Sequence, residues 1–292
     1  MTDTEQPTSV VVTGAAGRAG RAVVPHLRAQ GYTVTAVDLV KPPEGDPNLP
    51  GPLTRLQADL TNLGEVMEVL AGAGAVVHLA NIPAPGLFAP TRTFTENVGM
   101  NYNVFAAAQG LGLRRVAWAS SETTLGLPFD VPPRYAPVDE AHYPVPESSY
   151  ALSKVVTETM AEQFARHTGI PFVALRFSNI LGPAEYRTLP DTVWPDARAR
   201  RWNLWGYIDE RDVALSCQLA LEAPVTGARS YIIAAADTVM NRPSRELMAE
   251  VFPEVPVDDG LGEFETLLSI ARARAELGFE PQHSWRDTLR EQ

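Results

Sequence analysis

This sequence of 292 residues has a single cysteine, no long apolar run and no net positive charge. Its one cysteine, Cys217, cannot form an intramolecular disulfide, and the apolar residues around it predict a small core side chain on a buried helix face. No run of about 18 apolar residues occurs, and "MTDTEQPT" lacks the basic start and apolar stretch of a secretory signal. We therefore expect a cytoplasmic protein with a short frayed leader and no membrane partner.

Negative charge is in excess, with a formal net charge of -11 at pH 7. Nucleic acid is also negatively charged, so electrostatic repulsion makes it an unfavoured partner. Histidines at 78, 142 and 167 lack metal-ligand spacing and have no accompanying cysteine, so we expect no metal site. His78 lies in the apolar stretch "VVHLA", which favours a packed core residue.

Segments rich in β-forming residues alternate along the chain with segments of helical periodicity, which predicts a parallel sheet covered by helices. The expected strands are residues 9–14, 33–38, 53–59, 75–81, 114–121, 172–179 and 229–235. The expected helices are residues 19–31, 63–74, 94–112 and 148–169. This order predicts an α/β fold of the Rossmann type, a doubly wound parallel sheet with a small C-terminal substrate-binding lobe.

The expected division places the dinucleotide-binding part with the catalytic residues in 1–181 and the substrate-binding lobe mainly in 182–292. Residues from about 207 to 236 are expected to return to the first part. The proline- and glycine-rich residues 41–52 predict a surface excursion without chemistry. Residues 182–203 follow the carboxyl end of a strand, where open α/β sheets bind ligands.

The stretch "TGAAGRAG" follows a strand and opens a helix, as a dinucleotide-binding turn requires. Gly14 permits the tight turn, Gly17 lets the backbone approach the pyrophosphate, and Gly20 allows close helix–strand packing. Asp38 ends the second strand, where a carboxylate can accept hydrogen bonds from both ribose hydroxyls. This combination favours NAD.

Two basic residues near that site could instead accommodate the 2′-phosphate of NADP: Arg18 in the turn and Lys41 beyond Asp38. The carboxylate of Asp38 would repel that phosphate, so NAD is favoured and both basic side chains are expected to be solvated. Asp59 follows the third strand and has two open interpretations. It can bind the adenine amino group, or it can cap the next helix.

Tyr150 and Lys154 in "SSYALSKVVTE" are four residues apart and therefore share one helix face. An unperturbed tyrosine, with a pKa of about 10, is a poor base at neutral pH, but an adjacent ammonium group stabilises its phenolate. Ser120 and Ser121 end the preceding strand, where a hydroxyl can hydrogen-bond a reacting carbonyl oxygen. These residues predict a proton-transfer site.

Taken together, these motifs with "HLAN", "NVGMNYNV", "ASSETTLG", "LRFSNILGP" and "GYIDERDVA" resemble the extended short-chain dehydrogenase/reductases, the NAD-dependent epimerase/dehydratase family. The resemblance runs from about Val10 to Ala236. It implies that Tyr150 is the catalytic acid/base, that Lys154 binds the nicotinamide ribose, and that Ser121 holds the reacting oxygen. Ser121 is selected over Ser120 because the family's catalytic hydroxyl stands five residues before the motif's closing glycine.

The resemblance also implies binding residues. Those expected to contact NAD are Gly14, Ala16, Gly17, Arg18, Gly20, Asp38, Asp59, Leu60, Leu79, Ala80, Asn97, Tyr150 and Lys154. Those expected to contact substrate are Ser121, Glu122, Asn179 and Arg187. In "GYIDERDVA", the resemblance implies that Asp209, Arg211 and Asp212 form structural ion pairs between the lobe and the following helix.

Departures from the family pattern reduce the number of family reactions that this chain is expected to catalyse. Glu122 and Thr123 stand where sugar dehydratases have an Asp–Glu pair, which makes sugar dehydration unfavoured. Leu125 replaces the tyrosine usual in nucleotide-sugar epimerases. The segments "SSETTLG" and "GPAEYRTL" are similar to those of uronate dehydrogenases, in which the arginine matching Arg187 grips a carboxylate. A surface role for Arg187 stays equally open.

We therefore expect an NAD-dependent oxidoreductase that transfers a hydride at a hydroxyl-bearing carbon of a sugar or nucleotide sugar. A uronate or aldose 1-dehydrogenase and a non-catalytic NAD-binding sensor are the alternatives. The arginines at 198, 200 and 201 can bind a diphosphate, although a solvated face is favoured. The two helices that bear Asn97 and Tyr150 are candidates for a homodimer interface, as in family members.

Overall fold

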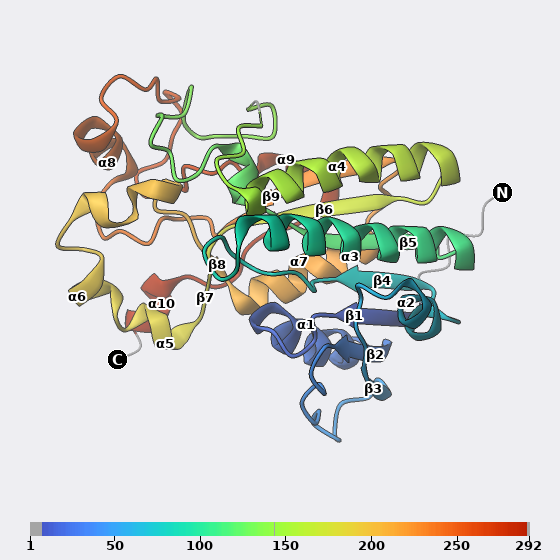
Figure 1. Ribbon diagram of the computed structural model, residues 1–292. Helices are drawn as coiled ribbons and strands as arrows, with labels where there is room; N and C mark the ends of the chain where they lie inside the picture. Colours follow the sequence, from blue (N-terminus) through green and yellow to red (C-terminus); the bar gives the residue numbers. More distant parts are fainter. Residues whose placement is uncertain (1–7, 143, 291–292) are drawn as a thin grey trace.

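The computed structural model describes residues 8–142 and 144–290 (Figure 1). The first seven residues of the expected leader lie outside this part of the chain. Among the described residues, no helix combines the length and apolar character needed to cross a membrane.

Seven parallel strands form the central sheet in the order β3-β2-β1-β4-β5-β6-β9. They are β1 (Ser9–Thr13), β2 (Thr33–Asp38), β3 (Leu53–Gln57), β4 (Ala75–His78), β5 (Arg115–Ser121), β6 (Phe172–Phe177) and β9 (Ala228–Ile233). Each expected strand is present. The order reverses between β1 and β4, so the chain winds outward in both directions from this point, as a Rossmann fold does. The predicted fold class is confirmed.

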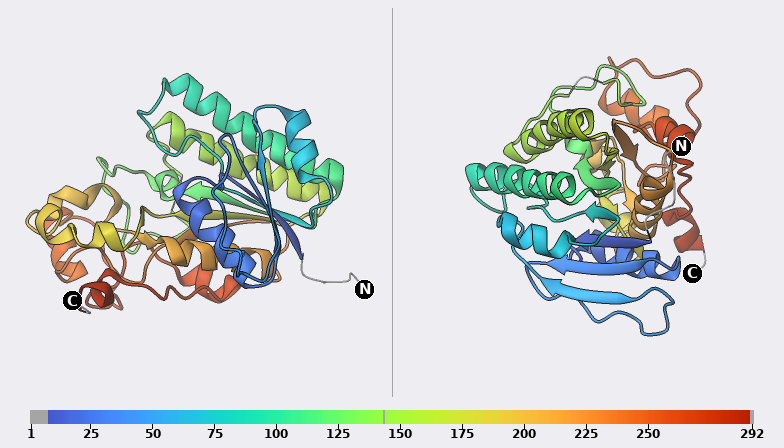
Figure 2. Two further views of the ribbon diagram at one scale, coloured as in Figure 1. Left: turned by 90° about the horizontal axis from the view of Figure 1, so that it is seen from below. Right: turned by 90° about the vertical axis from the view of Figure 1, so that its right-hand side faces the viewer.

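Helices cover both faces of the sheet (Figure 2). One face carries α1 (Arg18–Ala29), α7 (Glu210–Glu222) and α9 (Ala271–Leu277). The other carries α2 (Leu63–Leu70), α3 (Pro90–Leu111) and α4 (Ser149–Thr168). Successive strand residues point to opposite faces, so Val10 and Val12 pack with the first group of helices and Val11 with the second. Burial on both sides explains why the central strands β1 and β4 are mostly apolar.

The ends of these helices follow ordinary capping chemistry. Gly112 and Gly169 end α3 and α4 in the left-handed conformation that glycine adopts without strain. Asn62 caps α2 by accepting a hydrogen bond from the N–H of Gly64 at 2.9 Å. The interpretation of Asp59 as that cap is therefore wrong, because its carboxylate accepts from the N–H and hydroxyl of Thr61.

Residues 39–52 contain neither helix nor strand, as their composition predicts. The buried guanidinium of Arg28 in α1 donates hydrogen bonds to the backbone carbonyls of Asp46, Leu49 and Gly51. One side chain thus satisfies three carbonyl groups of a segment that has no regular hydrogen bonding of its own.

The lobe has a separate hydrophobic core, which includes Trp205, Phe252 and Trp285. Its elements are short: η1 (Glu122–Leu125), β7 (Ile180–Leu181), α5 (Pro183–Tyr186), α6 (Leu189–Thr192), η2 (Ala197–Asn203), β8 (Ile208–Asp209), α8 (Ser244–Val251) and α10 (Trp285–Arg290). The strands β7 and β8 pair in parallel as a two-stranded sheet.

The polar residues of the "GYIDERDVA" motif form hydrogen bonds that stabilise the fold. Asp209 accepts a bidentate pair of hydrogen bonds from Arg211 and one from the lobe's Tyr186 at 2.7 Å. Asp212 pairs with His283 at 2.8 Å. The expected ion pair of Asp209 with Arg211 is therefore present, and hydrogen bonds from Tyr186 and His283 join α7 and its N-cap to the lobe. Cys217 is fully buried in α7, as expected.

Candidate active site

The glycine turn between β1 and α1 leaves no room for side chains at two positions. Gly14 has a φ of +68°, and a Cβ there would lie 2.6 Å from the backbone nitrogen of Ala80. A Cβ on Gly20 would lie 2.2 Å from the carbonyl oxygen of Gly14. Gly17 precedes α1, so the free backbone N–H groups of the first helical turn face the space beyond the turn. This cradle fits a pyrophosphate group.

Asp38 at the end of β2 lies beside that turn. Its Oδ2 accepts a hydrogen bond from the backbone N–H of Ala16 at 2.9 Å. Its Oδ1 is 3.4 Å from the N–H of Val40 and lies at an exposed edge. The carboxylate is therefore held where an adenosine ribose bound next to the turn could donate to it.

The end of β4 is fixed against β1 by a threonine. The N–H groups of Leu79 and Ala80 lie 3.2 and 3.3 Å from the hydroxyl of Thr13, which also bonds Nδ1 of His78 at 2.7 Å. His78 is completely buried, as predicted, and burial lowers its pKa to about 3. It is therefore neutral at physiological pH.

Asn97 in α3 is fully buried, and its amide bonds both the N–H and the carbonyl of Ile82. The side chain thus fixes the loop that follows β4. A cofactor contact by Asn97 stays a prediction, but its donor and acceptor bonds to Ile82 indicate that the residue acts by shaping the loop. Leu60, also expected at the cofactor, is buried after β3.

Ser121, Tyr150 and Lys154 come together where β5 meets α4. The Ser121 hydroxyl lies close enough to Tyr150 to affect the pKa of its phenol, and it accepts a hydrogen bond from the hydroxyl of Thr123 at 3.0 Å. Nζ of Lys154 lies 5.5 Å from the centre of the Tyr150 ring and donates to the carbonyl of Ala119 at 2.7 Å. All three side chains are buried, so the proton-transfer set predicted from the sequence forms one cluster.

Burial shifts both titratable groups of this cluster toward their neutral forms. It raises the pKa of Tyr150 to about 12, to which the nearby charge of Glu122 contributes, while the neighbouring Ser121 hydroxyl opposes the shift. Burial also lowers the pKa of Lys154 to about 7, with Glu158 opposing that shift. Formation of a phenolate at neutral pH therefore requires positive charge close to Tyr150, which a charged lysine and an oxidised nicotinamide supply.

Glu122, expected at the substrate, points into a buried polar cluster instead. Its carboxylate accepts from the hydroxyl of Ser178 at 2.5 Å and from the amide of Asn203 at 3.2 Å. Burial raises its pKa to about 7, although these bonds, the backbone N–H of Asn179 and the charge of Arg200 all lower it. The cluster joins the catalytic loop to η2 of the lobe.

The three arginines near η2 differ in their surroundings. Arg198 is exposed, and Arg201 lies 3.6 Å from Asp130 at the surface. Arg200 donates to the carbonyl of Gly206 at 3.1 Å, and its Nε is buried without a hydrogen-bond partner. A solvated face is therefore the wrong description of Arg200. The charge of Arg200 acts on Glu122, which is 78 positions away in the sequence, and no local pattern reveals this relationship.

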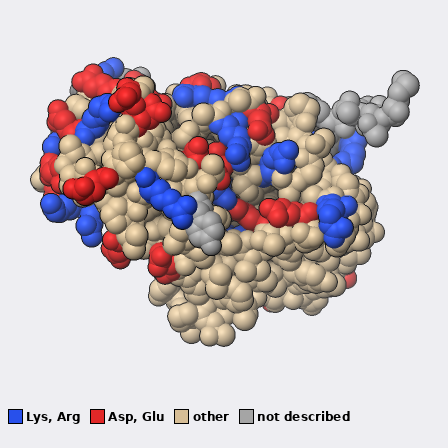
Figure 3. Space-filling model, turned by 90° about the horizontal axis from the view of Figure 1, so that it is seen from above, with Lys and Arg blue, Asp and Glu red and all other residues tan. Residues whose placement is uncertain are grey.

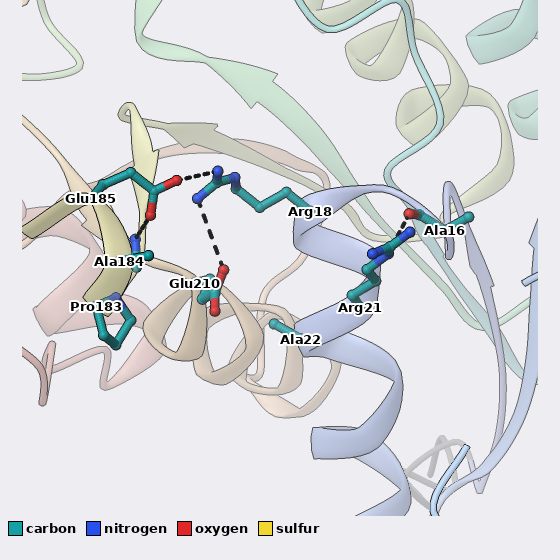
Figure 4. Close-up of a pocket in the computed structure, with 9 residues that line it drawn as sticks. Ala16, Arg18, Arg21, Ala22, Pro183, Ala184, Glu185 and Glu210 are labelled. Atoms are coloured by element: carbon teal, nitrogen blue, oxygen red, sulfur yellow. Dashed lines mark hydrogen bonds and ion pairs between the residues drawn. The ribbon is translucent and has the colours of Figure 1, made fainter. Parts of the chain in front are cut away.

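A cavity of about 510 Å³ separates the start of α1 from α5 and α7 (Figure 4). Arg18 reaches across it, forming an ion pair with Glu185 and lying 4.0 Å from Glu210. The Arg18 side chain is 45% exposed, in line with the expectation that it is solvated, and two carboxylates also attract it. Arg187 follows α5 and is exposed. The proton-transfer residues do not line this cavity.

Within residues 8–142 and 144–290, no group of three or more His, Cys, Asp or Glu side chains is placed to hold a metal ion.

The sequence matches the model of the NAD dependent epimerase/dehydratase family over residues 10–234. The chain therefore belongs to this family, as its motifs predicted, and its cofactor is NAD. Family membership and the similarity to known enzymes together indicate an NAD-dependent enzyme.

Among known proteins, the chain is 30% identical over 197 residues to the NAD-dependent glucose-6-phosphate dehydrogenase of Haloferax volcanii, covering 62% of this chain and 72% of the relative. It is 27% identical over 191 residues to a uronate dehydrogenase of Pseudomonas syringae pv. tomato, covering 63% of each. Its structure is similar to that of MoeE5 in complex with UDP-glucuronic acid and NAD, with a TM-score of 0.72, 25% identity and 97% coverage of both chains.

Proposed function

We propose that this protein oxidises a hydroxyl-bearing carbon of a sugar or nucleotide sugar with NAD, using Tyr150 as the acid/base. The observation that carries the proposal is the buried cluster of Ser121, Tyr150 and Lys154 at the carboxyl end of β5. The sheet places this cluster at the same edge as the glycine turn and Asp38, because parallel strands end together.

The residues divide the chemistry between them. Ser121 donates a hydrogen bond to the substrate oxygen, and the phenolate of Tyr150 takes the proton of the substrate hydroxyl. The ammonium group of Lys154 stabilises that phenolate and binds the ribose next to the nicotinamide. NAD, when bound, accepts the hydride that leaves the same carbon. Tyr150 then passes its proton to solvent.

A substrate with an anionic group is supported by two kinds of observation. The names of the relatives include glucose 6-phosphate, a uronate and UDP-glucuronic acid, each of which bears a phosphate or carboxylate. In this chain, Arg187 is exposed next to α5, where a guanidinium can bind such a group through two parallel hydrogen bonds. We therefore propose Arg187 as the anion-binding residue.

Oxidation of a sugar that carries no nucleotide, such as a sugar phosphate or a uronate, is the form of this reaction that the two relatives favour. Epimerisation of a nucleotide sugar, with the hydride returned to the other face, is the second candidate. The similarity to a UDP-glucuronic acid complex over 97% of both chains favours a nucleotide-sugar substrate. A non-catalytic NAD sensor is disfavoured because it has no need of the buried Tyr150 and Lys154.

The test is NADH absorbance after purified protein is mixed with NAD and separate pools of free aldoses, uronates, sugar phosphates and nucleotide sugars. NADH formation that falls at least about 100-fold in Tyr150→Phe supports the dehydrogenase, since general acid–base catalysis contributes at least that factor. Tyr102→Phe, which removes a surface hydroxyl, is the matched control and should retain activity. Interconversion of nucleotide sugars without NADH identifies an epimerase, and no reaction with any pool contradicts the proposal.

A further inference from the structure

Glu158 extends the row of functional residues on α4. Tyr150, Lys154 and Glu158 follow one another at intervals of four, so they lie on the same face of the helix. The Glu158 side chain is 12% exposed. On the face of the molecule that α4 forms, acidic and basic side chains lie close together around a depression (Figure 3).

Two strands hold the Glu158 carboxylate in place. From β5, the hydroxyl of Ser120 donates to Oε1 at 2.6 Å, and Ser120 is the residue directly before Ser121. From β6, Arg176 donates to Oε1 at 2.9 Å and to Oε2 at 2.7 Å. This bidentate geometry fixes both the position of the carboxylate and its negative charge.

We propose that Glu158 is a positioning residue for the Tyr150/Lys154 pair, to which it presents a fixed negative charge one helical turn beyond the lysine. The inference rests on the proposed function, because it assigns Glu158 a role in the same proton transfer. Tyr150 and Lys154 contact the reactants, whereas Glu158 acts through Lys154.

The surroundings of Lys154 explain why such a charge matters. Apart from Glu158, the lysine faces the Trp118 ring from β5 at 5.9 Å, the Tyr150 ring on α4, and His78 on β4. His78 is neutral, and burial favours the neutral form of Lys154 as well. Among the described residues, Glu158 is the carboxylate whose charge raises the pKa of Lys154.

The positive charge of Arg176 does not completely cancel the effect of Glu158 on the pKa of Lys154, because Arg176 lies between two acidic residues. The charge of Glu140 acts on Arg176 together with that of Glu158, and Glu140 in turn lies 3.7 Å from Arg272. The resulting chain of alternating charges runs from Glu158 through Arg176 and Glu140 to Arg272 in α9. A purely structural ion pair would stabilise the fold without altering the protonation of Lys154, which separates the two roles.

The experiment measures the protonation of Lys154 directly. Lys41 and Lys154 are the two lysines of the chain, so protein labelled at the lysine side-chain amine gives two NMR signals, and Lys41→Arg identifies them. In Glu158→Gln, which keeps the shape of the side chain but removes its charge, Lys154 should bind its proton about tenfold more weakly. Glu162→Gln is the matched control, since Glu162 is exposed one turn further along α4.

The NMR titration needs no substrate, so its outcome is independent of the proposed reaction. With a substrate, kcat/KM of Glu158→Gln should fall about tenfold because the proton shifts from Lys154 to Tyr150, while Glu158→Asp restores most of the loss. An unchanged Lys154 titration in folded Glu158→Gln overturns the inference. If Glu158→Gln does not fold, Ser120→Ala and Glu158→Asp should each weaken proton binding by Lys154 by a smaller factor. If the Lys154 titration is unchanged in both of these variants, the inference is also overturned.

Discussion

The backbone N–H of Ala16 donates a hydrogen bond of 2.9 Å to the carboxylate of Asp38, which joins the glycine turn to the end of β2. One oxygen of Asp38 thereby sets the position of the turn, and the other lies at an exposed edge. Structural and cofactor-binding roles are thus combined in one side chain, and a substitution can separate them.

Asp38→Asn keeps an oxygen for Ala16 but removes the negative charge and one acceptor. We expect the KM for NAD to rise about tenfold, because a hydrogen bond from a ribose hydroxyl to a charged group contributes about 1.5 kcal/mol or more. The KM for NADP should fall, since repulsion of the 2′-phosphate is lost. Asp46→Asn, in the surface excursion, is the control and should change neither value. If KM changed equally for NAD and NADP, the assignment of Asp38 as the ribose-binding residue would be contradicted.

Gly20→Ala should destabilise the protein by about 3 kcal/mol, because a Cβ 2.2 Å from the carbonyl oxygen of Gly14 forces α1 away from β1. Gly99→Ala in α3 is the matched control, since a Cβ there meets nothing within 4 Å. That change should raise the stability by about 0.5–1 kcal/mol, the usual preference of a helix for alanine over glycine. Urea unfolding of the two variants measures both effects, and a loss of stability at Gly20 no larger than at Gly99 would refute the packing argument.

Glu122 should make the stability depend on pH. Its pKa is about 7 in the folded protein, whereas the ordinary pKa of a glutamate is 4.5, so the folded protein binds more protons than the unfolded chain between these values. Stability should therefore fall as pH rises from about 4.5 to about 7. In Glu122→Gln this part of the decline disappears, so from below pH 4.5 to above pH 7 the variant should gain about 3 kcal/mol of stability relative to the wild type. Urea unfolding at a series of pH values tests this, and profiles of equal slope would show that Glu122 is charged throughout.

The α3/α4 surface is the predicted dimer interface. Tyr102, Leu152 and Val156 are exposed there, and the surface over α3 shows few charged side chains (Figure 3). We expect a dimer, which Val156→Glu should convert to monomer because the interface would bury an unpaired charge. Val131→Glu is the control, since Val131 is 74% exposed in a loop distant in sequence from both helices. Light scattering measures the mass, and a monomeric wild type would contradict the prediction.

The strands and the glycine turn could be predicted because their signals are local. A run such as residues 9–13 is apolar and β-branched whatever lies elsewhere in the chain, and Tyr150 and Lys154 meet because helical geometry fixes their spacing. The start of α3 was predicted four residues late, since Pro90 at the first helical position lies outside the apolar pattern.

The missed parts of the site depend on contacts between distant segments. Arg18 meets Glu185 across 167 positions, and Glu122 meets Asn203 across 81. Such pairs leave no periodic pattern in the sequence, because each partner alone resembles an ordinary surface residue. Their burial is decided by how the lobe packs on the sheet, which requires the three-dimensional structure.

The pairing of β7 with β8 has a consequence for how this architecture can vary. The chain leaves the sheet-bearing part at Ile180 and returns beside it at Ile208, held by the hydrogen bond from Ile208 N–H to the Asn179 carbonyl. Segments inserted between such adjacent points add little closure entropy as they lengthen. The length and sequence of residues 182–207 can therefore vary while the two ends of the segment stay fixed. Substrate preference can change in this way without any movement of the catalytic strand β5 or the catalytic helix α4.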